Sequence, residues 1–272
     1  MQLRRLTGAV AIIACVALGG AAPSFAAPPW APADSATIRP GNQTITAGAQ
    51  CTSNFVFYDG ANNVYLGQAA HCSGTGGATE TNGCDSGSLP VGTPVEIDGA
   101  TRPGTLAYNS WITMQGAGES DANTCDYNDF ALVRLDPADH GRVNPSIPFW
   151  GGPTGLVDST ATGAKVLSYG NSSLRGGITQ LSPKEGVSLG QSGGGWTHSV
   201  FTLTPGIPGD SGSAFIDRQG RAFGTLSTLA IAPLAGSNGV GDLSRELAYA
   251  RTHGADVTLA TGTEAFRGPL LP

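Results

Sequence analysis

The sequence predicts an all-β protein made of two packed β-barrels, with one helix near the end of the chain. Glycine and proline are abundant, with 41 and 18 residues among 272, as expected where many short strands are joined by tight turns. Strand-like segments fall into two groups on either side of the loop 150–153. The one convincing helical pattern follows the second group, and this order is typical of a pair of barrels.

The strand-like segments are short, rich in β-branched and aromatic residues, and bounded by turn signals. The clearest pair is 55–58 and 64–66, which Asp59 and Gly60 separate as in a hairpin. The predicted strands are 55–58, 64–66, 94–97, 105–107, 111–114 and 130–135 in the first group, and 165–169, 177–181, 199–203, 214–217 and 222–227 in the second.

The late helix is predicted over residues 243–252. Asp242 is a suitable N-cap residue, Glu246 lies in the early turns, and Gly254 follows the last turn. Apolar residues recur at helical spacing and give the helix one side to bury. These residues are Leu243, Leu247 and Ala250.

Residues 1–26 have the pattern of a signal peptide. Two arginines provide a positive start, residues 6–18 are apolar, and a cleavage site follows Ala26. A lipoprotein signal ending at Cys15 is the alternative, although the apolar stretch before that cysteine is unusually short. No later segment has about 18 consecutive apolar residues. We therefore expect a secreted, extracellular protein that has no membrane contact once the signal is removed.

The overall charge bears on the possible partners. The net charge is −6 and only 12% of the residues are charged, whereas a nucleic-acid-binding protein normally carries a clustered basic face. Such acidity is common in soluble proteins. We expect a monomer without a nucleic-acid partner or a cofactor.

Removal of the leader leaves four cysteines, Cys51, Cys72, Cys84 and Cys125. An even number in an exported protein predicts two disulfides, and four cysteines allow three pairings. A zinc site is the competing interpretation. It has little support, because no two cysteines have CxxC spacing and the four histidines are spread along the chain.

Gly209, Asp210, Ser211 and Gly212 form a segment suited to nucleophilic catalysis. Glycines beside Ser211 let the backbone turn sharply and present the hydroxyl group. The amides of Gly209 and Ser211 would then converge on one point and form an oxyanion hole for acyl transfer. Taken alone, such a segment is often only a turn.

His71 is the candidate general base. It follows small residues that allow close approach, and the neighbouring Cys72 would anchor its loop. A single histidine after a strand is more often structural than catalytic. The other histidines lack such a setting, and we interpret His140, His198 and His253 as surface or hydrogen-bonded residues.

Asp129 is the candidate acid that orients the histidine. It opens the apolar strand 130–135, where a carboxylate can be buried beside an imidazole, hold its tautomer and stabilise the imidazolium. The simpler interpretation is an aspartate that caps a turn. Asp126 is less suitable, because no strand follows it.

These three segments together resemble the signatures of the chymotrypsin/trypsin family of serine proteases, in its bacterial secreted branch. His71, Asp129 and Ser211 occur in the family's order and are separated by 58 and 82 residues. Each signature is weak or moderate alone, but all three in order are specific. The resemblance covers residues 47–227.

The resemblance implies two six-stranded antiparallel barrels with the active site in the cleft between them. It implies the pairs Cys51–Cys72 and Cys84–Cys125, and it assigns to Ser227 the family's serine that hydrogen-bonds the catalytic aspartate. The expected organisation is a lead-in or short pro-segment at 27–44, a protease domain at 45–255 and a tail at 256–272. Within the domain, barrel one covers 45–150 and barrel two 154–240.

The sequence departs from the family pattern around the nucleophile. Ser213 stands where the family usually has glycine, and no Ile-Val-Gly-Gly-like segment exists to supply a new N-terminus for Asp210. Bacterial relatives satisfy this aspartate with an internal cation. Lys165 and Arg142 are the candidates that we take from the sequence.

The resemblance also places a specificity pocket at Pro205, Thr228 and Leu229. Pro205 stands where trypsin-like relatives have the aspartate that binds Lys or Arg, and no acid occurs in 204–208. Leu229 replaces a small residue at the pocket mouth. A buried cation would lack a partner there. We therefore expect a shallow apolar pocket that favours Ala, Val or Leu before the cut.

The predicted function is a secreted serine endopeptidase that acts through a Ser-His-Asp triad and an acyl-enzyme on protein or peptide substrates. One alternative is a non-enzymatic binding protein whose pocket Leu229 closes. Another is an esterase that uses the same triad. The Gly-x-Ser-x-Gly elbow of α/β-hydrolases fits poorly, because Gly212 directly follows Ser211.

Overall fold

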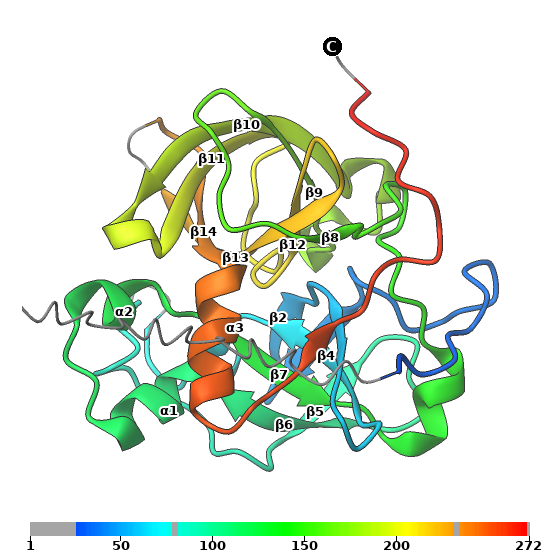
Figure 1. Cartoon of the computed structure of the whole chain (residues 1–272), viewed down its shortest axis with the longest axis horizontal. Coiled ribbons are helices and arrows are strands. Elements are labelled where there is room, and N and C mark those ends of the chain that lie inside the picture. The colour runs from blue at the N-terminus through cyan, green and yellow to red at the C-terminus, as the bar shows by residue number, and fades with distance from the viewer. Residues whose placement is uncertain (1–25, 78–80, 231–233, 271–272) are drawn as a thin grey trace, which may run out of the picture.

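The computed structural model describes residues 26–77, 81–230 and 234–270 of the chain. Its strands form two sheets that lie one above the other in Figure 1, and a late helix starts where they meet and runs beside the lower sheet. The predicted all-β class is therefore confirmed. The predicted signal peptide, apart from Ala26, lies outside the described residues.

The first sheet contains the N-terminal strands in the order β15-β3-β4-β7-β6-β5-β1-β2. Only residues 53–55 separate strands β2 and β3, and the chain bends there, so that β2 pairs with β1 and β3 pairs with β4. This bend brings the two ends of the sheet together into a barrel. The strands are β1 (Gln43–Thr46), β2 (Ala49–Thr52), β3 (Val56–Tyr58), β4 (Val64–Gln68), β5 (Pro94–Ile97), β6 (Gly104–Asn109), β7 (Ala131–Arg134) and the C-terminal β15 (Thr258–Leu259).

The second sheet is closed by hydrogen bonds. Strand β12 pairs with both β9 and β13, which completes an antiparallel barrel in the order β12-β9-β10-β11-β14-β13. A short strand, β8, adds to β13 in parallel. The strands are β8 (Gly155–Leu156), β9 (Lys165–Tyr169), β10 (Pro183–Ser192), β11 (Thr197–Leu203), β12 (Ala214–Asp217), β13 (Arg221–Ala230) and β14 (Ser237–Asp242).

Two predicted strands are wrong. Residues 111–114 lie in helix α1 (Ser110–Ala117), because the side chain of Asn109 accepts hydrogen bonds from the main-chain N–H groups of Trp111 and Ile112 and starts a helix there. Residues 177–181 contain a short 3-10 turn, η4 (Thr179–Leu181), in place of a strand.

Other elements were not predicted. Helix α2 (Ala122–Tyr127) begins at an Asp121 cap. Strands β10 and β14 are rich in glycine and serine, so their local pattern is weak, and their neighbours in the closed barrel supply their pairing. The remaining 3-10 helices are η1 (Ala70–Ser73), η2 (Pro137–Arg142), η3 (Ser173–Arg175) and η5 (Gly193–Gly195).

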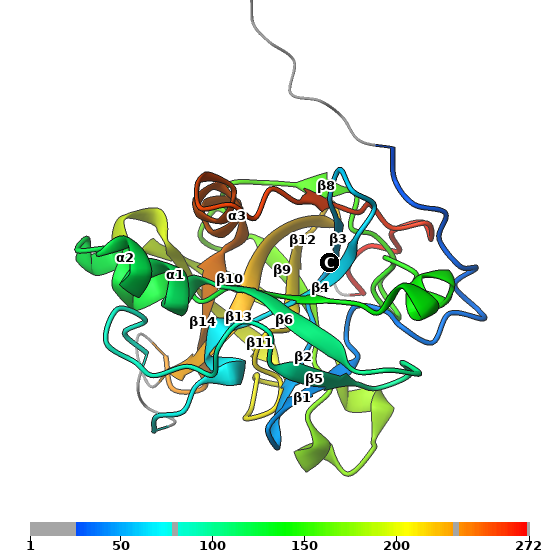
Figure 2. The same cartoon turned by 90° about the horizontal axis from the view of Figure 1, so that it is seen from below.

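The predicted late helix is confirmed as α3 (Leu243–Thr252). Asp242 caps it, and its Oδ1 accepts a hydrogen bond of 3.0 Å from the main-chain N–H of Arg245. The helix buries its apolar side in a cluster that also contains Phe130 of barrel one and Ile216 of barrel two. Figure 2 shows α3 beside both groups of strands. The helix therefore holds the two barrels together.

Both terminal segments pack on the barrels. Ile38 is completely buried and pairs with Val143, and Arg39 forms an ion pair with Glu264 of the tail. Strand β15 of the tail extends the first sheet. None of the helices in the described part of the chain is long and apolar enough to cross a membrane.

Candidate active site

A cleft of about 590 Å³ lies where the two barrels meet. Barrel one contributes His71 and Cys72 to its lining, and barrel two contributes Gly209, Ser211 and Ser227. The fold thus brings together residues that are up to 156 positions apart in the sequence.

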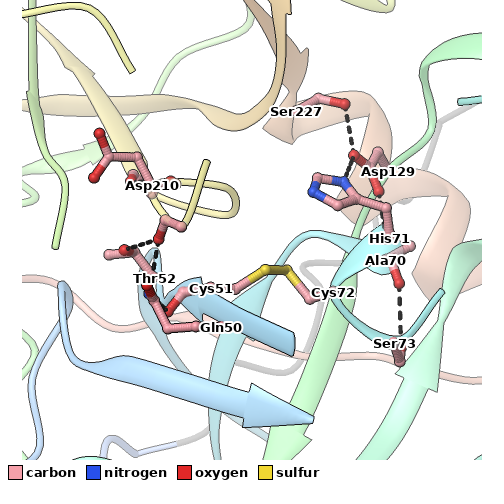
Figure 3. Close-up of a disulfide and its surroundings, with 12 residues drawn as sticks. Gln50, Cys51, Thr52, Ala70, His71, Cys72, Ser73, Asp129, Asp210 and Ser227 are labelled. Atoms are coloured by element: carbon pink, nitrogen blue, oxygen red, sulfur yellow. Dashed lines mark hydrogen bonds and ion pairs between the residues drawn. A yellow bond between two sulfur atoms is a disulfide. The ribbon is translucent and has the colours of Figure 1, made fainter. Parts of the chain in front are cut away.

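His71 and Asp129 form a close pair. The imidazole Nδ1 lies 2.7 Å from Asp129 Oδ2, and the main-chain N–H of His71 donates to Oδ1 at 2.9 Å. The side chain of His71 is 27% exposed, whereas that of Asp129 is 5% exposed. Nδ1 therefore binds the buried carboxylate, while the second ring nitrogen, Nε2, lies on the side of the ring away from Asp129 (Figure 3).

The two pKa values move apart as this pair requires. Burial lowers the pKa of His71, but the charge and hydrogen bond of Asp129 outweigh burial and raise it above its ordinary value. Burial raises the pKa of Asp129, but the charge of His71 and three hydrogen bonds outweigh it and lower the pKa. At neutral pH the carboxylate is therefore ionised and stabilises an imidazolium.

Local contacts hold Asp129 in place. Helix α2 ends just before it, and Ser110 Oγ donates to the carbonyl of Asn128 at 2.7 Å and accepts from the main-chain N–H of Phe130 at 3.0 Å. One side chain thus binds the backbone on both sides of the aspartate. The unpredicted helix α1 carries this serine at its first position.

Ser227 joins the pair from the other barrel. Its hydroxyl donates to Asp129 Oδ2 at 2.5 Å from strand β13 (Figure 3). The role that the resemblance gave to Ser227 therefore matches its position.

The loop of Ser211 depends on glycine at two positions. Gly209 and Gly212 have φ values of +92° and +87°, which side chains rarely tolerate. A Cβ on Gly209 would lie 2.4 Å from Gln50 Oε1, and one on Gly212 would lie 2.6 Å from the carbonyl oxygen of Thr52. The loop therefore packs against barrel one too closely for any larger residue.

The amides of this loop alternate between bonded and free. The N–H of Asp210 donates to the carbonyl of Ile207 at 2.8 Å, and that of Gly212 donates to Leu226 at 2.7 Å. The N–H groups of Gly209 and Ser211 donate to no group in the described residues. They remain available for an oxyanion. Within the described residues, no hydrogen bond joins the Ser211 hydroxyl to His71, although both residues line the same cleft.

Gln50 and Thr52 also belong to the site, and no sequence motif pointed to either residue. Thr52 Oγ1 and Gln50 Nε2 donate to the carbonyl of Gly209 at 2.7 and 2.9 Å. Both lie on β2, more than 150 residues from the loop they hold. They tie the nucleophile loop of barrel two to barrel one.

Asp210 is completely buried and binds two cations. Arg175 Nη2 lies 2.5 Å from Oδ2 and Lys184 Nζ lies 3.2 Å from it. The prediction that Lys165 or Arg142 pairs with Asp210 is wrong. Lys165 pairs with Glu185 at 3.4 Å, and Arg142 pairs with Asp139 at 3.5 Å. Arg175 follows β9 on a short turn and Lys184 opens β10, so only the closed barrel brings them to Asp210.

Comparison with known proteins agrees with this geometry. No protein-family model matches the sequence, and no curated protein does. Among solved structures, Thermobifida fusca protease A is 19% identical, with a TM-score of 0.55 over 83% of this chain and 99% of that protein. Nocardiopsis protease is 17% identical, with a TM-score of 0.52 over 82% of this chain and 98% of that protein. Both are chymotrypsin-like bacterial serine proteases.

The chain has the chymotrypsin-like fold. At these identities the likeness establishes the fold, and the resemblance read from the three motifs is confirmed at that level.

The residues that the resemblance assigned to a specificity pocket lie in two places. Thr228 and Leu229 line the cleft, but Pro205 does not. The Pro205 carbonyl instead accepts hydrogen bonds from Arg175 and Lys184 at 3.1 and 3.4 Å. Pro205 is thus a binding partner of the cations that hold Asp210.

Asn238, which the sequence did not single out, lies between the walls of the pocket. Its Nδ2 donates to the carbonyls of Gly206 and Thr228, both at 3.2 Å, and its Oδ1 accepts from the Gly206 N–H at 2.8 Å. The residue is 1% exposed, whereas Leu229 is 56% exposed. The buried Asn238 side chain therefore joins Gly206 to Thr228 at the cleft.

The cysteines form the pairs implied by the resemblance. Cys51–Cys72 joins β2 to η1, which carries His71, and Cys84–Cys125 reaches α2, which leads to Asp129. A ring nitrogen of His71 lies within 4.8 Å of the sulfurs of the first pair. Disulfide sulfurs are not thiolates, so this donor set does not suit zinc.

Proposed function

We propose that the chain is an exported serine endopeptidase in which His71, Asp129 and Ser211 are the catalytic residues. The observation that carries this proposal is the buried Asp129 carboxylate, which bonds His71 on one side and Ser227 of the other barrel on the other. Ser211 and two free amides line the same cleft. Two disulfides and the predicted signal peptide support export to an oxidising compartment.

The first half of the reaction forms the acyl-enzyme. Ser211 Oγ attacks the scissile carbonyl while His71 Nε2 takes the hydroxyl proton, and the N–H groups of Gly209 and Ser211 bind the oxyanion. The C–N bond then breaks and His71 gives the proton to the leaving amine. Catalytic hydrogen bonds are often loose before substrate binds, so the contact between Ser211 and His71 forms with substrate in place.

The second half releases the acid. Water loses a proton to His71 as its oxygen attacks the acyl carbon, and the Ser211 oxygen leaves and recovers the proton. Asp129 holds the ring orientation throughout and stabilises the imidazolium without taking the proton itself.

The pocket supports preference for a small apolar residue before the cut. Asn238 uses both donors of its amide to bridge Gly206 and Thr228, so it limits the depth of the pocket. None of the described residues that line the cleft is acidic, and a Lys or Arg side chain would find no anion there.

One experiment tests the activity. A fluorescent phosphonate should label the purified mature protein at Ser211 and fail to label Ser211→Ala. The protein should then cleave amide substrates and ester substrates that share the same acyl group. Absence of labelling, or cleavage of esters alone, would contradict an endopeptidase.

A second experiment tests the pocket. Peptides that differ only before the cut should be cleaved faster after Ala or Val than after Phe or Arg, by about tenfold or more. Asn238→Ala should admit Phe, while Leu229→Gly should change the preference less. Faster cleavage after Arg, Lys or Glu would overturn this assignment. Leu229, the residue on which a closed binding pocket would depend, is 56% exposed where it lines the cleft.

A further inference from the structure

Glu246 is a completely buried glutamate on α3, at the junction of the two barrels. The helix packs against β13, the strand of Ser227. Figure 1 shows α3 beginning where the two sheets meet and running down beside the lower one. Glu246 forms no ion pair within the part of the chain that the structure describes. The reaction as derived above does not use it.

Glu246 belongs to a chain of polar contacts between the barrels. Thr225 Oγ1 of β13 donates to Glu246 Oε2 at 3.0 Å, and Asn54 Nδ2 of barrel one donates to Thr225 Oγ1 at 3.3 Å. On the other side, the main-chain N–H of Asp129 faces the Glu246 carboxyl. The glutamate thus connects β13 with the backbone that carries the candidate catalytic aspartate.

The space around the carboxyl is tight, and none of the described cations forms an ion pair with it. A Cβ on Gly241 would lie 2.2 Å from Glu246 Oε1, and this oxygen has no hydrogen-bond partner in the described residues. The adjacent Arg245 is directed to the Trp196 ring, 5.9 Å from its centroid. An ionised Glu246 would therefore place unpaired charge in the interior, which is very costly.

The charged groups that face Glu246 are negative. They are the carboxylates of Asp129 from barrel one and Asp242 from β14, while His71 lies beyond Asp129 and the Tyr108 phenol approaches from β6. Burial, followed by the charge of Asp129, raises the pKa of Glu246 well above its ordinary value. The hydrogen bond from Thr225 and the nearby main-chain N–H of Asp129 lower this pKa and do not offset the rise.

We propose that Glu246 is a positioning residue for the hydrolysis: an uncharged carboxylic acid that ties Asp129 of barrel one to Thr225 of barrel two. This inference rests on the proposed function. The triad is divided between the barrels, so a link directly behind Asp129 fixes the distance between its two halves. The proton on Glu246 keeps a second negative charge away from the His71–Asp129 pair.

The protonation state has a consequence for stability. A carboxyl with a raised folded pKa keeps its proton where the unfolded chain has lost it. Stability therefore falls as pH rises from the unfolded value, about 4.3, to the folded pKa. Glu246→Gln has the same shape, cannot ionise and removes this term. Its melting temperature should exceed that of the wild type by a margin that grows from pH 4 to pH 8.

Glu96→Gln is the matched control, because Glu96 is an exposed glutamate on β5 of barrel one. Its melting temperature should follow the wild type at every pH. A constant difference for Glu246→Gln across this range would overturn the proposal. Melting curves require no activity, so this result stands whether or not the protein is a peptidase.

The positioning role has its own readout in enzymes titrated with the phosphonate. Glu246→Gln should keep kcat and the pH midpoint of its acid limb. Glu246→Leu, which breaks the link, should lower kcat about tenfold with little change in KM. A Gln variant whose acid limb moves to lower pH would show that Glu246 is ionised in the wild type and would overturn the proposal. If Leu does not fold, the Gln results still decide the matter.

Discussion

Asp129 and Asp210 are both buried at the cleft, but their surroundings differ. Asp129 bonds a histidine, which can gain and lose a proton near neutral pH, and the hydroxyl of Ser227. Asp210 bonds Arg175 and Lys184 and accepts a hydrogen bond from the main-chain N–H of Ser172. One carboxylate therefore has a partner whose charge changes during a reaction cycle, and the other is held by cations.

The same residue type therefore has two roles, which its partners determine. Asp129 can respond to proton transfer because its partner is titratable. Asp210 fixes the backbone next to Ser211, and Ser213, the departure from the family pattern, donates its hydroxyl hydrogen bond to the Asp210 carbonyl. The first region serves chemistry, and the second serves the shape of the loop.

The largest expected effect concerns the residues that act with Asp129. Ser211→Ala and His71→Ala should each lower kcat by roughly 10⁴ or more, and the double variant should lose little further, because triad members act as a unit. Steady-state kinetics on a peptide substrate measure this. Activity within tenfold of wild type in purified Ser211→Ala would end the serine-protease proposal.

The comparison itself is tested by exchanging each aspartate for asparagine. Asp129→Asn should lower kcat about 10⁴-fold with a small change in stability. Asp210→Asn should cost about 3–5 kcal/mol of unfolding free energy, because it leaves two buried cations short of an anion. Denaturant unfolding and kinetics on both variants decide.

Asp126→Asn is the control for this pair, since Asp126 is an exposed residue of α2. It should change neither quantity much. The comparison fails if Asp210→Asn leaves stability unchanged or if Asp129→Asn retains most activity.

The disulfides distinguish the two regions further, because both lie in barrel one on the Asp129 side. Their sequence separations are 21 and 41 residues, so loss of Cys51–Cys72 or Cys84–Cys125 should cost about 3 or about 4 kcal/mol in the chain-entropy model. Under reductant, hydrogen exchange should rise at 70–73 before it rises at 209–212. Equal changes in both loops would contradict separate roles, and a Cys51–Cys84 peptide in a mass-spectrometric map would contradict the pairing.

The smallest expected effect is the dependence of activity on pH. His71 must be neutral to accept the Ser211 proton, and its pKa is raised above the ordinary value of about 6.5. Activity should therefore fall about tenfold per pH unit below a midpoint above 6.5. A pH–rate profile measures it, and a maximum near pH 4 would indicate a carboxylate mechanism instead.

The contribution of His71 to folding stability should decrease as pH rises, whereas activity increases. A histidine with a raised folded pKa contributes stability that is fully present below the unfolded pKa and is lost as pH rises through the folded pKa. His71→Ala should therefore lose more stability at pH 5 than at pH 8. Titration of the His71 ring protons by NMR in Ser211→Ala gives the midpoint independently.

The sequence alone identified the parts of this protein that depend on local chemistry. The glycines around Ser211 are needed because φ is positive at two of them, and the helix at Leu243–Thr252 follows from its cap and its apolar period. The order of His71, Asp129 and Ser211 predicted the fold. The strand predicted at 111–114 is wrong, because the Asn109 side chain caps a helix there.

Contacts between segments that are distant in the sequence depend on the tertiary structure. Arg175 and Lys184 reach Asp210 because β9 and β10 are neighbours in a closed barrel. Their positions in the sequence do not distinguish them from Lys165 or Arg142 as partners of Asp210. The roles of Gln50, Asn238 and Glu246 could likewise not be predicted from the sequence, because the role of a polar residue depends on the group that it faces. Burial and charge pairing depend on neighbours in space, and the chain closes these contacts only when both barrels form.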